Sequence, residues 1–315
     1  MNRFAASFSL LKKILVALAV FAGTLPLFSE PIRYSGSDFL AGEPEKALNA
    51  AIQTATAEAP VSKLEGTLSG EKELRAGTAD LAVLILPNRG KELPEVQSGK
   101  WKVFPLGYQV AYVAVASANP TTSISFSTLA SIFGNYAKKQ ASSWEEAGVS
   151  GFGSALTACV GDQSKTDAVS FFQHEVLPNF ALKPTVRTFV DDEDVFREIL
   201  NSPGVIAIVG SPAPSGAPVK MLAVANDESL PGNGANPSGR NATAYPPTFA
   251  NIYNGDYPLT IPLCVVYPAE KSLALKPALS FLYSQKMAEL LAEAGFLPLE
   301  NRLREQFQKG IDNIK

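Results

Sequence analysis

The sequence predicts an α/β protein of two lobes, each a mostly parallel sheet flanked by helices. The chain has 315 residues, and at roughly 150 residues per domain this length corresponds to about two domains. Short apolar runs alternate with helical patterns, an order typical of α/β domains. Two long β-rich runs, 107–117 and 258–267, bracket a self-contained α/β stretch. We therefore expect the chain to cross into a second lobe and return to the first, with a ligand cleft between the lobes.

The first stretch follows the order strand, helix, strand, helix, strand. Leu48 and Ile52 recur at helical spacing, and the continuous apolar run 81–86 is typical of a strand buried on both faces. The expected elements are strands at 31–34 and 81–86, an extended stretch after Pro60, a polar turn at 66–70, and helices at 43–57 and 71–76.

The stretch between the two β-runs repeats this alternation. Ser125 or Ser127 is a candidate cap for a helix at 126–133. Residues 227–256 are rich in Gly, Pro, Asn and Ser and predict a long loop. The other expected elements are strands at 156–160, 205–209 and 222–226, helices at 167–175 and 191–201, and a C-terminal helix at 275–294 that ends at Gly295. We assign 30–110 plus 260–315 to the first lobe and 111–259 to the second.

The N-terminus has the pattern of a secretory signal peptide at 1–29. Arg3, Lys12 and Lys13 precede the apolar run 14–28, which Pro26 interrupts and which is shorter than the roughly 20 residues of a membrane-spanning helix. An uncleaved anchor is the alternative, and the cleavage site stays open. Removal of this segment takes away three basic and no acidic residues, so the formal charge of -3 becomes -6. We expect a periplasmic protein.

The composition excludes several classes of function. With 27 basic and 30 acidic residues the chain offers no basic surface for nucleic acid. One His and two Cys are too few soft ligands for a zinc or iron–sulfur site, so we expect no metal and no cofactor.

Nucleophilic catalysis is not expected either, because His174 would be its sole His base. Cys159 and Cys264 could pair in an oxidising compartment, but both lie in short apolar runs and two buried free thiols are the preferred interpretation.

Short motifs follow one another along nearly the whole chain after residue 29. These motifs are Tyr-Ser-Gly-Ser at 34–37, Leu-Arg-Ala-Gly-Thr-Ala-Asp-Leu-Ala at 74–82, Pro-Leu-Gly-Tyr at 105–108, Asn-Pro at 119–120, Phe-Ser-Thr-Leu-Ala-Ser-Ile-Phe-Gly at 126–134, Ser-Trp-Glu-Glu-Ala-Gly at 143–148, Ser-Pro-Gly-Val-Ile-Ala at 202–207, Tyr-Pro-Leu at 257–259 with Pro-Leu at 262–263, and Ala-Gly-Phe-Leu-Pro-Leu at 294–299. In this order they resemble the phosphate-binding-protein family of ABC transporter substrate-binding proteins. The resemblance implies the type II periplasmic binding fold, a phosphate-like ligand and a membrane permease as partner.

A binding site for a small oxyanion needs backbone N–H groups at helix N-termini together with Ser and Thr hydroxyls. Three turns before expected helices supply such groups, although each is also an ordinary helix cap. The candidate ligand-binding residues are Ser35, Gly36, Ser37, Thr67, Ser69, Gly70, Ser164, Lys165 and Thr166.

The sequence also departs from the family pattern. Gly161 or Asp162 stands where the family has Arg, and Lys165 replaces a Gly. The apolar residues 84–86 replace the carboxylate that accepts the proton of monohydrogen phosphate in close phosphate binders. Asp80 is expected to be structural, with Arg89 as a weak replacement.

We therefore expect a monomeric, non-enzymatic periplasmic protein that captures phosphate or a related oxyanion. The alternative is an envelope scaffold or interaction protein with a degenerate ligand site.

Overall fold

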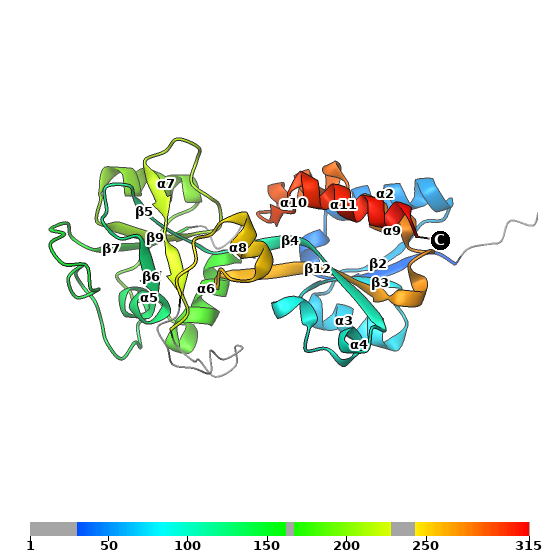
Figure 1. The fold of residues 1–315 in the computed structure, drawn as a ribbon, viewed down its shortest axis with the longest axis horizontal. Helices are drawn as coiled ribbons and strands as arrows, with labels where there is room; N and C mark the ends of the chain where they lie inside the picture. The colour runs from blue at the N-terminus through cyan, green and yellow to red at the C-terminus, as the bar shows by residue number, and fades with distance from the viewer. Residues whose placement is uncertain (1–29, 162–166, 228–242, 315) are drawn as a thin grey trace, which may run out of the picture.

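The computed structural model describes residues 30–161, 167–227 and 243–314. Two lobes lie side by side along the long axis, each with its own sheet and helices (Figure 1). The predicted two-lobed α/β class is confirmed. The segment 1–29, predicted to be a signal peptide, lies outside the described residues.

The first lobe contains a six-stranded sheet in the order β13-β4-β12-β3-β1-β2. Its strands are β1 (Arg33–Gly36), β2 (Val61–Lys63), β3 (Leu81–Ile85), β4 (Trp101–Val110), β12 (Thr260–Pro268) and β13 (Leu297–Pro298). β1 pairs in parallel with β2 and β3, whereas β12 is antiparallel to both β3 and β4, and β13 is antiparallel to β4. The sheet is therefore mixed rather than mostly parallel, because the returning strand β12 enters at its centre.

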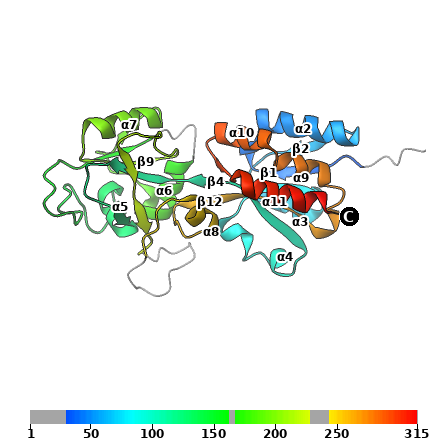
Figure 2. The same ribbon diagram turned by 45° about the horizontal axis from the view of Figure 1, so that its top comes forward.

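Helices cover both faces of this sheet (Figures 1 and 2). The helical elements are η1 (Asp38–Leu40), α2 (Glu43–Thr56), α3 (Thr67–Ala76), η2 (Pro87–Gly90), α4 (Pro94–Gln97), η4 (Ala269–Lys271), α9 (Lys276–Leu282), α10 (Gln285–Glu293) and α11 (Asn301–Asp312). Alternate residues of β3 point to opposite faces: Leu81 and Val83 join the main core, and Leu84 packs with Leu74 and Trp101 in a separate cluster. The continuous apolar run 81–86 therefore has the two-sided burial that the sequence predicts.

The second lobe contains a five-stranded sheet in the order β10-β5-β9-β7-β8, together with the short pair β11-β6. The strands are β5 (Tyr112–Ala116), β6 (Ser123–Ser125), β7 (Thr157–Val160), β8 (Arg187–Thr188), β9 (Val205–Val209), β10 (Val219–Met221) and β11 (Ala223–Ala225). The helices are α5 (Phe126–Phe133), α6 (Ala168–Val176), η3 (Pro178–Phe180), α7 (Asp192–Asn201) and α8 (Phe249–Asn254). This sheet is mixed too, because β5 is antiparallel to β9 while β7 is parallel to both β8 and β9.

Two adjacent segments connect the lobes. β4 ends at Val110 and β5 begins at Tyr112, so the long β-run predicted at 107–117 is two strands that belong to different sheets. The connecting residue Ala111 donates its N–H to Leu259 O (3.0 Å) and accepts a hydrogen bond from the buried Tyr257 Oη (3.0 Å). These bonds tie the outgoing segment to the returning one.

Several predicted elements differ from the structure. The first strand begins at Arg33 rather than at residue 31. The loop predicted at 227–256 contains α8, which Thr248 caps by accepting the N–H of Asn251. The helix predicted at 275–294 is two helices, because Ser284 caps a new helix by accepting the N–H of Met287. The last helix, α11, was not predicted.

Candidate functional site

Two glycines bring the β1–η1 turn against the first turn of α3. A Cβ atom on Gly70 would lie 2.5 Å from Gly36 Cα, and a Cβ on Gly36, which has φ +128°, would lie 2.0 Å from Val83 O. Only glycine permits such a close backbone approach at both positions. The predicted residues Gly36 and Gly70 therefore set the spacing of the two turns.

The predicted turn at 66–70 is already helical, since α3 begins at Thr67 after Gly66. Thr67, Ser69 and Gly70 thus lie in the first turn of α3 and do not precede it. Thr67 Oγ1 accepts the N–H of Ile85 (3.0 Å), and Ser69 Oγ donates to Glu65 Oε2 (3.2 Å). No cap residue's side chain binds the start of this helix, and the neighbouring Leu68 side chain is 83% exposed. Among the described residues, no side chain therefore caps the first N–H groups of α3, which an anion site requires.

Ser35 and Ser37 are both buried, at 1% exposure each. Ser35 Oγ donates to Gly70 O (3.3 Å) and strengthens the contact between the two turns. The backbone N–H of Ser37 donates a hydrogen bond to Val83 O (2.7 Å), and Ser37 Oγ accepts one from the N–H of Phe39 (3.4 Å). Within the described part of the chain, no acceptor takes the proton of Ser37 Oγ, so this hydroxyl can donate to a ligand.

The predicted residues Ser164, Lys165 and Thr166 lie outside the described residues. The residues on either side of this segment are described, and they explain one departure from the family pattern. A Cβ atom on Gly161 would lie 1.9 Å from Asp192 Oδ1. The carboxylate of Asp192 accepts the N–H groups of Gly210 (3.0 Å) and Ser211 (2.9 Å). A side chain at position 161 would therefore meet the Asp192 carboxylate, which these two N–H groups hold in place.

Two carboxylates approach each other from opposite lobes. Asp38 begins η1 in the first lobe and is exposed, and Asp167 precedes α6 in the second lobe. Partial burial raises the pKa of the Asp167 carboxyl, and the negative charge of Asp38 raises it further. This arrangement places negative charge next to the turns that would hold an anion, and it was not apparent from the sequence.

Asp80 is structural, as predicted. Its carboxylate accepts hydrogen bonds from the Arg33 backbone N–H (2.8 Å) and guanidinium (2.9 Å), and it also binds Lys271 Nζ. Burial alone would raise the pKa of Asp80, but the Arg33 and Lys271 bonds outweigh it and the pKa is lowered. Arg89, the predicted replacement, lies in a different cavity that is described below.

The two cysteines are free and buried, in β7 and β12 respectively, so the preferred interpretation of two separate thiols is confirmed. His174 is exposed at 63% of its side chain, stacks on Phe180 and contacts Glu175 Oε1 (3.1 Å). Within 30–161, 167–227 and 243–314, no three His, Cys, Asp or Glu residues are grouped as a metal site. In the same ranges no helix is both long enough and apolar enough to cross a membrane.

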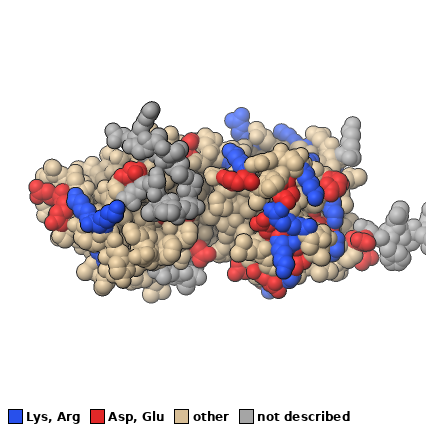
Figure 3. All heavy atoms as spheres, turned by 90° about the horizontal axis from the view of Figure 1, so that it is seen from below, with Lys and Arg blue, Asp and Glu red and all other residues tan. Residues whose placement is uncertain are grey.

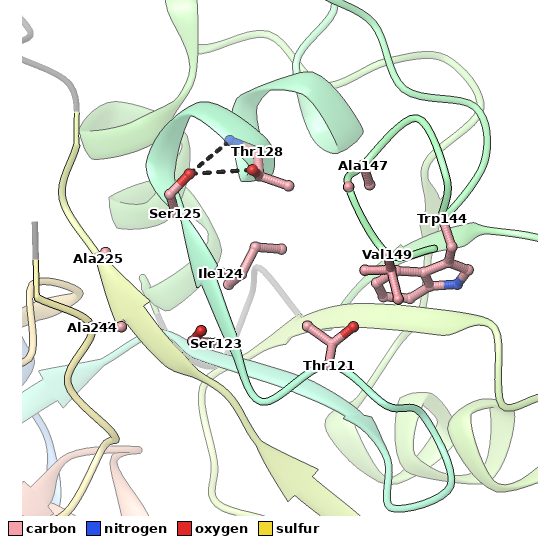
Figure 4. A pocket seen from close by; sticks show the side chains of 11 residues that line it. Thr121, Ser123, Ile124, Ser125, Thr128, Trp144, Ala147, Val149, Ala225 and Ala244 are labelled. Carbon is pink, nitrogen blue, oxygen red and sulfur yellow. Dashed lines mark hydrogen bonds between the residues drawn. The ribbon is translucent and has the colours of Figure 1, made fainter. Parts of the chain in front are cut away.

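A small hollow of about 260 Å³ lies inside the second lobe, away from the predicted site (Figure 4). Its lining includes Thr121, Ser123, Ser125 and Thr128 on one side and Trp144 with Val149 on the other. Ser125 Oγ caps α5 by accepting the N–H of Thr128 (3.3 Å), as the sequence predicts. Trp144 Nε1 donates to Gly204 O (2.9 Å). These groups serve the packing of the lobe.

Charge is distributed unevenly over the surface. In the view of Figure 3, acidic and basic side chains are mixed over the first lobe, and the visible part of the second lobe is largely uncharged. No dense basic surface appears among the described residues on this face.

The protein has two lobes, and in the first lobe Gly36 and Gly70 bring two turns into close contact. This is the type II periplasmic binding fold. The chain is 25% identical over 243 residues to protein SphX from Synechococcus elongatus, covering 75% of this chain and 68% of SphX. No family model matches the chain.

Two solved structures share the fold. A possible phosphate binding protein from Planctomyces limnophilus superposes with a TM-score of 0.65 at 18% identity, covering 91% of this chain and 99% of that protein. An ABC-type phosphate transport receptor from Vibrio cholerae gives a TM-score of 0.52 at 19% identity, covering 85% of this chain and all of the receptor's. The predicted resemblance to phosphate-binding proteins is confirmed at the level of the fold.

Proposed function

We propose that the protein is a solute-binding protein that captures phosphate or a related small oxyanion between its lobes. The observation that carries this proposal is the Gly36–Gly70 approach, which holds the buried Ser37 hydroxyl beside the open N-terminus of α3. Hydroxyls and helix N–H groups together replace the hydration of an anion without burying an uncompensated charge.

The proposed lobes are 30–110 plus 260–315 and 111–259, with the hinge at Ala111 and Leu259. Closure about this hinge brings α6 of the second lobe toward the turns of the first. The protein would act as a monomer in the periplasm, after export directed by 1–29, and would deliver its ligand to an ABC transporter permease. The resemblance to a receptor named for ABC-type phosphate transport supports this role.

Isothermal titration calorimetry with phosphate, sulfate, molybdate and tungstate tests the binding claim. We expect at least one anion to bind, and Ser37→Ala to weaken that binding by at least about tenfold, because a charge-assisted hydrogen bond contributes roughly 1.5–3 kcal/mol. Ser98→Ala is the matched control, since Ser98 is an exposed serine at the end of α4. The absence of binding by all four anions would refute the proposal. Fractionation of cells producing the chain with and without 1–29 tests export.

A second candidate, an envelope interaction protein with a degenerate site, is favoured by one observation. Asp38 and Asp167 face the anion position from both lobes, and Ile85 stands near the strand end where the family pattern has polar residues. The second candidate replaces the first if two results are obtained together. No anion binds, and the wild-type protein captures an envelope protein that a variant with substituted cleft turns fails to capture.

A further inference from the structure

A cavity of about 300 Å³ lies between the lobes, and its described lining contains none of the six predicted site residues that the structure describes. Its walls come from η2, β4 and β12 of the first lobe and from α8 and α6, which lie close together in Figures 1 and 2. The residues that matter for its chemistry are Arg89, Tyr108, Phe171, Glu175, Tyr253 and Thr260. We call it the Arg89 pocket.

Arg89 is held firmly in this pocket. Asn88 and Arg89 both have left-handed backbone conformations, with φ of 49° and 55°, which are uncommon for residues other than glycine and often mark functional sites. The guanidinium lies 4.5 Å from the centre of the Tyr253 ring. Its Nη2 donates to Tyr108 Oη (3.1 Å) and to Tyr253 O.

Within 30–161, 167–227 and 243–314, the positive charge of Arg89 has no carboxylate in contact with it. Among the described residues no carboxylate lies within ion-pair distance of this half-buried guanidinium. Burial raises the pKa of Tyr108 to about 12, so this phenol stays neutral at physiological pH. Within the described lining, Lys91 adds a second positive charge and Glu175 is the acidic residue, so the described lining is net positive.

The rest of the pocket combines flat aromatic walls with one unused polar atom. Tyr253 stacks on Phe249 with ring centres 6.1 Å apart and meets Tyr108 edge-on at 6.4 Å. Phe171 contributes an apolar wall from the second lobe. Thr260 Oγ1 is buried and has no hydrogen-bond partner within the described part of the chain, which is costly unless a ligand supplies one.

We propose that the Arg89 pocket binds a small organic anion with a flat apolar body. A carboxylate or phosphate monoester accepts hydrogen bonds from the guanidinium, and Thr260 Oγ1 adds one more bond. The apolar body lies against the aromatic walls, which inorganic phosphate lacks the surface to use. Because Phe171 and Glu175 come from α6, an occupant touches both lobes and favours one interlobe arrangement. This inference does not depend on the proposed capture of phosphate.

Titration calorimetry of the purified protein with phenyl phosphate and with benzoate tests the pocket. We expect both compounds to bind, and Arg89→Gln to weaken each by at least tenfold. Thr260→Val, which suits a strand and keeps the side-chain shape, is expected to weaken phenyl phosphate by about three- to fivefold. Arg187→Gln is the matched control, because Arg187 also lies over an aromatic ring, that of Phe189 at 5.1 Å, but in the second lobe away from the pocket.

Competition with inorganic phosphate separates this site from the proposed phosphate site. Two results support a separate pocket: phenyl phosphate still binds in the presence of saturating inorganic phosphate, and it binds to the Ser37→Ala variant as tightly as to wild type. Complete competition by inorganic phosphate, or unchanged binding by both Arg89→Gln and Thr260→Val in folded protein, would overturn the proposal. Failure of phosphate, sulfate, molybdate and tungstate all to bind counts only against the proposed function.

Discussion

Asp80 binds Lys271 across the first sheet, although 190 residues of sequence separate them. Asp80 precedes β3, Lys271 ends η4 after β12, and Arg33 at the start of β1 completes the cluster with a bond of 2.9 Å to Asp80. One carboxylate therefore joins both chain segments that build the first lobe.

Replacement of Asp80 by Asn is expected to lower the free energy of unfolding by about 2 kcal/mol at pH 7, because it leaves two partly buried cations without their counter-charge. The folded-state pKa of Asp80 is lowered, so its contribution is present above the unfolded pKa and is lost as the pH falls through the folded pKa. The difference in the free energy of unfolding between wild type and Asp80→Asn should therefore shrink in acid.

Urea unfolding at pH 7 and pH 3 measures this difference. Glu43→Gln is the control, because Glu43 pairs with Lys46 at an exposed position and its loss should leave stability unchanged. Equal stability of Asp80→Asn and wild type at pH 7 would contradict the structural role of Asp80.

Gly70→Ala is expected to lower the free energy of unfolding by about 3 kcal/mol or more, since the added Cβ meets backbone atoms of Gly36 that cannot move independently. Gly310→Ala is the control within the same lobe. Gly310 is an exposed helical residue of α11 with no atom near its Cβ position, so this change should stabilise by about 0.5–1 kcal/mol. Thermal or chemical unfolding distinguishes the two, and similar effects at both positions would show that the close approach is absent.

Asp167→Asn is expected to tighten anion binding at pH 7 by about threefold, roughly the effect of removing one like charge several ångströms away in a solvated cleft. The pKa of Asp167 is raised, so its charged form costs stability above the folded pKa and this cost disappears as the pH falls below the unfolded value. The variant should therefore also be more stable than wild type at pH 7 but not in acid.

Calorimetric titration and unfolding at both pH values measure the two effects of Asp167→Asn. Glu145→Gln, an exposed carboxylate of the same lobe, is the control. A variant that is less stable than wild type at pH 7 would show that the Asp167 charge is favourable where it lies.

Both thiols are expected to be unreactive in the native protein. Burial raises the pKa of Cys159 to about 11 and that of Cys264 to about 12, so little thiolate exists at pH 8. Ellman's reagent should titrate no thiol rapidly under native conditions and two thiols in guanidinium chloride without reductant. Fewer than two in the denaturant would indicate a disulfide or another oxidised form.

Local patterns in the sequence predicted local structure well. The run at 205–209 is β9 with the same bounds, and Ser125 caps α5 because a short hydroxyl side chain there reaches the N–H of Thr128. What the sequence could not show is which strands meet across long separations. The antiparallel pairing of β12 with β3 and β4 follows from the return of the chain. The sheets are therefore mixed and not mostly parallel, although β1 pairs in parallel with β2 and β3, and β7 with β8 and β9.

The sequence identified two turns of the candidate site but not how their groups are used. Ser35, Gly36 and Gly70 lie where the two turns meet, and Thr67 binds the Ile85 N–H. That these residues hold a ligand stays a prediction. The approach of Asp38 to Asp167 depends on the placement of two lobes and leaves no local signal. The Arg89 pocket was missed because α8 lies in a segment whose Gly, Pro and Asn content predicted only a loop.

The position of β12 has a consequence for the order in which the chain can fold. A ribosome or a secretion channel releases residues 30–110 long before 260–268, so β3 and β4 emerge with the gap between them unfilled. Open strand edges of this kind invite pairing with other chains. The second lobe is contiguous in sequence and can complete its sheet first, whereas the first lobe closes only when its last strand arrives. Substitutions that slow the folding of the second lobe should therefore prolong the exposure of the first lobe's edges and increase aggregation during synthesis.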